Sequence, residues 1–243
     1  MAPRQRIDRL LVERGLFESR AKAQAAIAAG RVSADGIVVD RPSDEIAADA
    51  VLHAAPAHPW VSRGGVKLAA ALDHFRIDPA GRACLDVGAS TGGFTEVLLA
   101  RGARRVHALD VGRDQLHASL RARPDVVAIE GTDIRTLDPA LLAEPPDFVT
   151  IDVSFISLKL VLPAALALAQ PPAHMLALIK PQFEAGRRAL KKGIVRDPHV
   201  RAAVCDDIAA LVAALGWSVA GIVSSPIAGG DGNREFFIAA RRH

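Results

Sequence analysis

The feature that most constrains the fold is a series of apolar runs, each of which ends in a polar or glycine-containing turn. There are five such runs, ACLDVG (83–88), RVHALDVG (105–112), DVVAIEGTD (125–133), DFVTIDVS (147–154) and MLALIKP (175–181). Nearly continuous apolar strands that alternate with helical stretches are typical of a parallel sheet covered by helices. We therefore predict an α/β domain over residues 62–243.

Two further strands are predicted near the end of the chain, WSVAGIVSSP (217–226) and EFFIAARR (235–242). The glycine-rich segment AGGDGN (228–233) between them is too short for a crossover helix, so the two strands should be antiparallel. Seven strands that close on an antiparallel hairpin indicate a Rossmann-like methyltransferase sheet. Dinucleotide-binding domains differ because they end in parallel strands. The assignment to a methyltransferase sheet rests on this analogy of folds.

The first 55 residues have a different pattern, which predicts a small α+β domain. Apolar residues at helical spacing precede Gly15, and Ser19 is placed to cap a second helix that ends at Gly30. The dipeptide Asp35-Gly36 favours a tight hairpin turn, because both residue types tolerate positive φ. We assign residues 1–55 to this domain and the proline-containing residues 56–61 to a stiff linker.

Composition excludes several classes of protein. Hydrophobic residues make up 50% and charged residues 23% of 243 residues, which is the balance of a globular protein. Cys84 and Cys205 lie far apart and have no neighbouring ligands, so we expect no metal, no disulfide and a cytoplasmic location. The apolar run 160–169 is shorter than the ~20 residues of a membrane span, and MAPRQRIDRL lacks the apolar segment of a secretory signal. A net charge of +3 permits an RNA partner without requiring one.

A glycine-rich turn, DVGASTGGF (86–94), follows the first strand and begins a helix. Glycines allow the backbone to approach a ligand closely, and a helix N-terminus presents free N–H groups. The spacing differs from GxGxxG, and no Lys follows as in GxxxxGK[ST], so NAD and ATP are disfavoured. The pattern instead favours S-adenosylmethionine.

Acidic residues follow three successive strands, at Asp86, Asp110 and Asp133. Carboxyl ends of parallel strands meet at one edge, where open α/β folds bind their ligands, and Asp110 is placed to accept hydrogen bonds from ribose hydroxyls. The alternative is that these aspartates cap the helices that follow them. The predicted cofactor-binding residues are Asp86, Gly88, Ala89, Ser90, Gly92, Gly93, Phe94, Asp110, Val111, Asp133, Ile134 and Asp152.

The segment Asp152-Val153-Ser154-Phe155 bears on which atom receives the methyl group. Enzymes that methylate amino groups of nucleic acid usually have an Asn or Asp followed by two prolines and an aromatic residue at this position, and this segment lacks that pattern. Carbon methylation of pyrimidines needs a cysteine nucleophile, and neither cysteine of this chain is placed to serve as one.

The residues that remain at this edge suit a hydroxyl acceptor, which must be activated before it can attack. We assign Lys180 as the activating group, Asp152 and Glu235 as its orienting partners, and Lys67 as a second cation near the acceptor ribose. The alternative for each lysine is an ordinary solvated charge.

These motifs carry a resemblance to a known family. The segments SRGGVKL (62–68), LDVGASTGGFTEVLL (85–99), DVSFISL (152–158), LIKPQFEAGR (178–187) and GNREFF (232–237) resemble the TlyA family of ribosomal RNA ribose methyltransferases, also known as haemolysin A. Its wider relatives are the FtsJ-like 2′-O-methyltransferases, whose Lys-Asp-Lys-Glu tetrad falls on Lys67, Asp152, Lys180 and Glu235. The resemblance implies methylation of a cytidine 2′-hydroxyl in ribosomal RNA with S-adenosylmethionine as cofactor.

The N-terminal segments RIDRLLVERG (6–15) and SRAKAQAAIAAGRVSADG (19–36) resemble an RNA-binding module of a ribosomal small-subunit protein. Cations in the first turn of a helix oppose its macrodipole, so Arg20 and Lys22 are better explained by an anion site. The candidate RNA-binding residues are Arg4, Arg6, Arg20, Lys22 and Arg31, with a solvated basic face as the alternative. Few aromatic residues are available for stacking, so we expect recognition of folded RNA by shape.

The chain ends shortly after the last predicted strand, whereas longer members of the family act on both ribosomal subunits. We therefore expect large-subunit RNA, within a subunit or a ribosome, as the substrate. Two alternatives stay open. One is an RNA-binding assembly factor with a vestigial methyltransferase fold, and the other is a membrane-lytic haemolysin, which the absence of a predicted span or strongly amphipathic basic helix disfavours.

Overall fold

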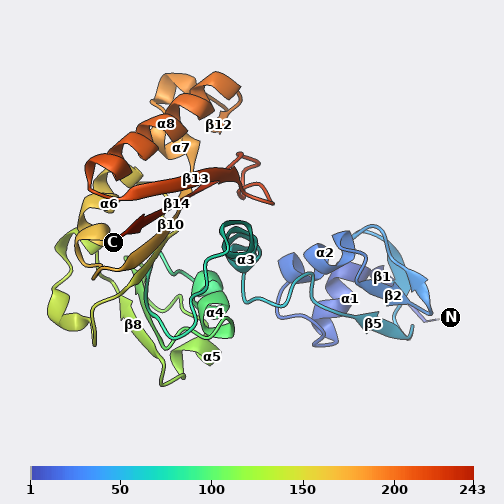
Figure 1. Ribbon diagram of the computed structural model, residues 1–243. Coiled ribbons are helices and arrows are strands. Elements are labelled where there is room, and N and C mark those ends of the chain that lie inside the picture. The colour runs from blue at the N-terminus through green and yellow to red at the C-terminus, as the bar shows by residue number, and fades with distance from the viewer. Residues whose placement is uncertain (1) are drawn as a thin grey trace. The chain divides into compact units, whose positions relative to one another are not determined.

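The computed structural model describes residues 2–243, and the chain divides into two compact units, Met1–Pro59 and Trp60–His243 (Figure 1). The division falls inside the predicted linker 56–61. No helix among the described residues is long and apolar enough to cross a membrane.

The first unit packs two helices against short strands. Its elements are β1 (Arg4–Arg6), α1 (Ile7–Glu13), α2 (Arg20–Ala28), β2 (Val32–Ala34), β3 (Ile37–Val38), β4 (Glu45–Ala47) and β5 (Leu52–Ala54). Strand β2 pairs antiparallel with β3 and β5, and β1 pairs antiparallel with β4. The predicted hairpin is confirmed, whereas β1, β4 and β5 are too short to leave a periodic pattern in the sequence.

Local signals account for the helix ends and the turn of this unit. The Ser19 hydroxyl accepts the backbone N–H of Lys22 at 3.3 Å, so Ser19 caps α2 as predicted. Asp35 and Gly36 both have positive φ, at 50° and 80°, which is the geometry of a primed hairpin turn. The core formed by Ile7, Leu11 and other apolar side chains is small but fully enclosed.

The second unit is built on a seven-stranded sheet of order β13-β14-β10-β9-β6-β7-β8. Its strands are β6 (Ala83–Val87), β7 (Arg105–Asp110), β8 (Val126–Glu130), β9 (Phe148–Ile151), β10 (Ala173–Ile179), β13 (Ser218–Ser224) and β14 (Phe236–Arg242). Pairing is parallel from β8 to β10, and β14 is antiparallel to both of its neighbours. The predicted Rossmann-like sheet with an antiparallel close is confirmed.

Helices cover both faces of this sheet (Figure 1). Helices α3 (Arg63–Phe75) and α4 (Gly93–Ala100) pack on one face, where Leu72 and Leu98 meet Phe148. Helices α6 (Leu158–Ala167) and α8 (Pro198–Ala214) pack on the other face. Shorter elements are α5 (Ala118–Arg121), η1 (Ile134–Thr136), η2 (Pro139–Leu141), α7 (Pro181–Glu184), η3 (Arg187–Ala189), β11 (Leu190–Lys191) and β12 (Ile194–Val195).

The strand order reverses at β6, which has β7 on one side and β9 on the other. Loops on the two sides of such a point diverge, and this leaves a crevice at the carboxyl ends of the strands. The glycine-rich turn after β6 and the segment after β9 both start at this crevice. The fold therefore brings the predicted motifs to one place.

Candidate active site

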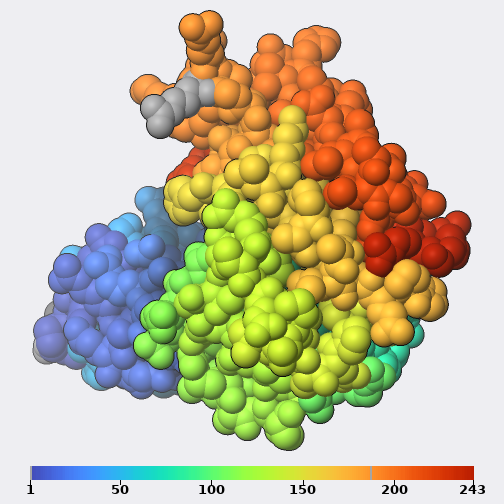
Figure 2. Space-filling model, turned by 90° about the vertical axis from the view of Figure 1, so that its left-hand side faces the viewer, coloured from blue at the N-terminus to red at the C-terminus, as the bar shows by residue number. Residues whose placement is uncertain are grey.

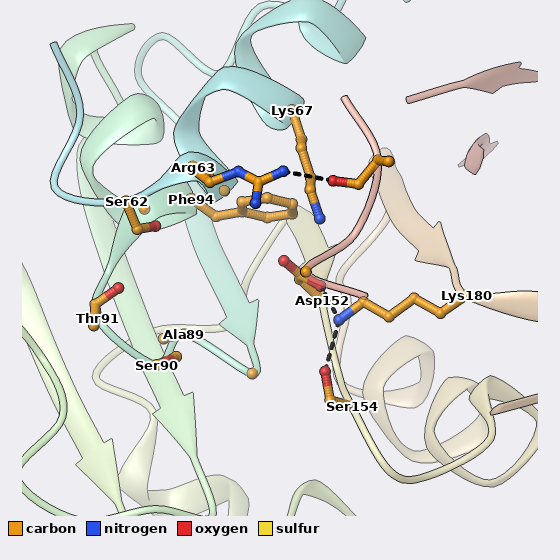
Figure 3. Close-up of a pocket in the computed structure, with 15 residues that line it drawn as sticks. Ser62, Arg63, Lys67, Ala89, Ser90, Thr91, Phe94, Asp152, Ser154 and Lys180 are labelled. Atoms are coloured by element: carbon orange, nitrogen blue, oxygen red, sulfur yellow. Dashed lines mark hydrogen bonds and ion pairs between the residues drawn. The ribbon is translucent and has the colours of Figure 1, made fainter. Parts of the chain in front are cut away.

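Two adjoining cavities occupy the crevice, with volumes of about 420 and 370 Å³. They share a boundary made of Gly88, Ser90, Asp152 and Ser154. The first cavity is lined by charged and small polar groups (Figure 3), and the second is bordered by apolar side chains with Asp110 at its edge. Such a pair suits a ligand with an apolar part and a charged part.

Lys180 lines the first cavity. It follows β10, and its Nζ lies 2.6 Å from Asp152 Oδ1 and donates a hydrogen bond of 2.8 Å to Ser154 Oγ (Figure 3). Asp152 and Ser154 come from the segment after β9, which lies beside β10 in the sheet. The side chain of Lys180 is 10% exposed, so its ammonium is held in one position at the cavity wall.

Lys67 brings a second cation to the same cavity from α3. Its Nζ is 2.5 Å from Glu235 Oε2, and both side chains are buried. Glu235 precedes β14, which places its carboxylate behind Lys67. The structure thus brings the four predicted residues together as two ion pairs, and it corrects one assignment, because Glu235 orients Lys67 and not Lys180.

The glycines of the turn are required by contacts within the chain. A Cβ on Gly88, which has φ +84°, would lie 2.5 Å from the carbonyl oxygen of Asp152. A Cβ on Gly93 would lie 2.1 Å from Ser62 Oγ, and one on Gly92 would overlap Leu120. Absence of side chains therefore lets the turn close against its neighbours. The turn residues that line the first cavity are Gly88, Ala89, Ser90, Thr91, Gly93 and Phe94.

Asp86 lies beneath the turn and is fully buried. Thr95 Oγ1 donates to one carboxylate oxygen at 2.7 Å, and Thr150 Oγ1 donates to the other at 3.0 Å. Burial raises the pKa of this carboxyl to about 7, despite the two threonine hydrogen bonds. Asp86 is thus placed to support the turn from below, whereas the prediction had put it in contact with the cofactor.

Asp110 ends β7 and connects two loops of the second cavity. Its carboxylate accepts the backbone N–H of Ser90 at 2.8 Å and that of Gly112 at 2.7 Å. Carboxylate oxygens have further lone pairs, so the group can still accept hydrogen bonds from a ligand. Val111 and Ile134 line the same cavity.

Asp133 differs from the prediction in its local role. Strand β8 ends at Glu130, and Asp133 instead caps η1 by accepting the backbone N–H of Arg135 at 2.9 Å. The Arg135 guanidinium, 2.6 Å away, holds the pKa of this carboxyl below its usual range. The capping alternative is therefore correct for Asp133, although the residue also lines the second cavity.

Several lining residues were absent from the predicted set, among them Arg63, Ser154 and Phe155. Arg63 donates to the carbonyl oxygen of Ala228 at 2.7 Å across the first cavity (Figure 3). Ser154 binds Lys180, and Phe155 lies at the second cavity with 92% of its surface exposed and φ +64°. The sequence signal for them was their position beside predicted site residues, within SRGGVKL and DVSF.

In the first unit, a buried carboxylate organises two of the predicted RNA-binding residues. Asp8 accepts from Arg6 at 3.1 Å and from Arg20 at 2.7 Å, and these guanidinium groups lower the pKa of its carboxyl far below the usual range. Both arginines remain about half exposed. The sequence does not single out Asp8. An acidic residue in the first turn of a helix is usually an exposed surface residue, whereas Asp8 is buried.

The other predicted RNA-binding cations have separate surroundings. Lys22 pairs with Glu18, which lies just before the N-cap of α2, and Arg4 donates to the backbone carbonyl of Glu45. Arg31 lines a cavity of about 380 Å³ together with His53. Among residues 2–243, no group of three or more His, Cys, Asp or Glu side chains is arranged to hold a metal ion.

Comparison with known families divides the chain in the same way as the fold. Residues 60–242 match the FtsJ-like methyltransferase family, and residues 5–52 match the S4 domain family.

Individual relatives cover between 73% and 100% of the chain. The 16S/23S rRNA (cytidine-2′-O)-methyltransferase TlyA of Mycobacterium tuberculosis is 47% identical over 99% of this chain and 91% of that protein. The 23S rRNA (cytidine-2′-O)-methyltransferase TlyA of Campylobacter jejuni is 39% identical over 73% of this chain and 69% of that protein. A solved structure of a protein named as a hemolysin from Streptococcus thermophilus superposes with a TM-score of 0.77 at 39% identity, over 100% of this chain and 90% of that one.

Proposed function

The chain belongs to the TlyA family of ribosomal RNA methyltransferases, and we propose that it transfers a methyl group from S-adenosylmethionine to the 2′-hydroxyl of a cytidine in large-subunit ribosomal RNA. The observation that carries this proposal is the position of Lys180 and Asp152, paired at the junction of the two cavities. The names of the two TlyA relatives, from Mycobacterium tuberculosis and Campylobacter jejuni, both give cytidine 2′-O-methylation and both include 23S rRNA.

The two cavities fit the cofactor. Apolar side chains of the second cavity, Val111 and Ile134 among them, would hold the adenine, and the Asp110 carboxylate would accept hydrogen bonds from the ribose hydroxyls. Gly88 lies at the boundary with the first cavity, so the amino acid part would lie along the glycine-rich turn. When bound, S-adenosylmethionine supplies an electrophilic methyl group.

Lys180 is the residue that we assign to activation of the acceptor. A ribose hydroxyl is a weak nucleophile, and negative charge on its oxygen must be stabilised as its proton leaves. The ammonium of Lys180 is oriented by Asp152 and Ser154, so its remaining hydrogen-bonding capacity points to whatever occupies the cavity. Lys67, held by Glu235, adds positive charge on the opposite side of Asp152.

The first unit supplies RNA affinity in this proposal. Arg6 and Arg20 share the buried Asp8 and keep about half of each guanidinium exposed, which is suited to contacts with phosphates. A vestigial fold is disfavoured, since both ion pairs of the tetrad and both cavities are intact. A cytoplasmic location fits an enzyme with a ribosomal substrate.

The test is methyl transfer from labelled S-adenosylmethionine to large subunits, small subunits and whole ribosomes that lack the modification. The RNA is then digested to nucleosides and separated. Label in 2′-O-methylcytidine from large subunits is the expected result. Label in a base, or no label in any particle despite measured cofactor binding, would contradict the proposal, and label from small subunits alone would overturn the choice of substrate.

A further inference from the structure

A short hairpin after the active-site lysine carries an unusual concentration of positive charge. Strands β11 and β12 pair antiparallel, and Lys192 and Gly193 form the turn with φ +52° and +78°. Between Glu184 and Asp197 the chain contains no acidic residue. We call residues 188–196 the basic hairpin, and its exposed cations are Arg188, Lys191, Lys192 and Arg196.

These four cations lack acidic partners. None of them forms an ion pair with a residue of the described chain, whereas several exposed cations elsewhere in the same unit do so. Arg101 pairs with Asp73, Arg123 with Asp125, and Lys159 with Asp207. Like charges held close together repel one another, so an uncompensated group of this kind is best explained by an anionic partner.

The basic hairpin is attached to the active site at both of its ends. It follows Lys180 through the single turn of α7. On the other side, the buried side chain of Asn233 accepts the backbone N–H of Val195 at 3.1 Å and donates to the carbonyl oxygen of Gly193 at 3.0 Å. Asn233 lies two residues before Glu235, so the hairpin is held to the loop that leads to the tetrad. Figure 2 shows this orange segment projecting from its unit.

We propose that the basic hairpin is a second RNA-binding surface, which contacts phosphates of the substrate RNA close to the methylated nucleotide. The proposal rests on the proposed function. Exposed cations on a projecting backbone turn suit sequence-independent contacts with phosphate groups, which position RNA without reading bases. The methyltransferase unit therefore binds RNA itself, and affinity is not confined to the S4 domain.

The test compares two triple variants of the full chain that lose the same amount of charge. One is Arg188→Gln/Lys191→Gln/Lys192→Asn, in which Asn suits the left-handed backbone at position 192. The matched control, Arg101→Gln/Arg123→Gln/Lys159→Gln, removes ion-paired surface cations of the same unit. Binding to unmodified large subunits is measured by filter retention over a series of salt concentrations, and cofactor binding by calorimetry.

For the hairpin variant we expect affinity for large subunits to fall about tenfold or more, and the slope of log K against log salt to become shallower by about 2 to 3. The control should stay within about twofold of the wild type. Cofactor affinity should be unchanged in both variants. An unchanged salt slope in the hairpin variant, or an equal loss of affinity in the control variant, would overturn the proposal. A hairpin variant that keeps its affinity for RNA and loses affinity only for an acidic protein would also overturn it, and would assign the surface to a protein partner.

Failure of this proposal is distinguishable from failure of the proposed function. If the wild type methylates cytidine and the hairpin variant binds and methylates equally well, only the second surface is wrong. If the wild type binds large subunits in a hairpin-dependent way but transfers no methyl group, the surface stands and the reaction is wrong.

Discussion

Lys67 and Glu235 are separated by 168 positions in the sequence, yet their charged atoms are 2.5 Å apart in the interior of the methyltransferase unit. Helix α3 supplies the lysine, and the residue before β14 supplies the carboxylate. The pair joins the first element of the unit to its last strand. It therefore connects the stability of the unit with the geometry of its active site.

Removal of one member of this pair should destabilise the unit. Glu235→Ala leaves a buried ammonium without a partner, which costs about 3 to 5 kcal/mol, whereas Lys67→Met/Glu235→Leu removes both charges and should recover most of the loss. Urea unfolding followed by tryptophan fluorescence is a suitable measurement, because Trp60 and Trp217 both lie in this unit. Methyl transfer should stay low in the double variant. Recovery of activity together with stability would show that the pair is purely structural.

Lys180→Ala should reduce methyl transfer about 10² to 10⁴-fold, because the hydroxyl loses the group that activates it. Cofactor affinity should change by less than about twofold, since Lys180 lines the first cavity and not the second, where we place the adenine and the ribose. Single-turnover transfer and calorimetry check the two expectations. Lys159→Ala, which removes an exposed lysine paired with Asp207, serves as the control. Normal turnover by Lys180→Ala would remove Lys180 from the mechanism.

Asp86 should make the stability of the unit depend on pH. Its pKa is about 7 in the folded chain, against about 3.9 for an ordinary aspartate, so the folded state binds more protons between these values. The stabilisation is complete below pH ~4 and is lost as pH rises through ~7, a change of a few kcal/mol. Asp86→Asn lacks this titration. Free energies of unfolding of the two proteins, measured from about pH 5 to 8, should therefore converge or cross as pH rises, and parallel curves would contradict the prediction.

Glu130 should control cofactor affinity from outside the cavity. Its carboxylate accepts the backbone N–H groups of Asp114, Gln115 and Leu116 at 2.9 to 3.1 Å, and this holds the loop that lines the second cavity. Loss of three such hydrogen bonds in Glu130→Ala should weaken S-adenosylmethionine binding about tenfold. The transfer rate at saturating cofactor should change little. Asp125→Ala, which removes an acid paired with Arg123, is the control for calorimetry, and equal affinities would refute the prediction.

Local patterns were sufficient for much of this molecule. Strand and helix identity followed from apolar periodicity, the cap at Ser19 from residue type, and the primed turn from Asp35-Gly36. Each of these features depends on a few residues that are neighbours in the sequence, so the local sequence is sufficient to predict it. Asp133, in the turn after β8, shows the limit of that reasoning. An aspartate is typical both of the end of a strand and of a helix cap, so the residue type did not distinguish the two roles.

Contacts between distant segments could be decided only by the folded chain. The need for glycine at position 88 was visible in the sequence, but its cause is the carbonyl oxygen of Asp152, in the segment that follows another strand. Residue types likewise predicted two lysines and two carboxylates at one edge, and the sheet order then paired Lys180 with Asp152 and left Glu235 to Lys67. Periodicity reports which face a residue occupies, whereas the identity of its partner depends on how strands far apart in sequence are placed side by side.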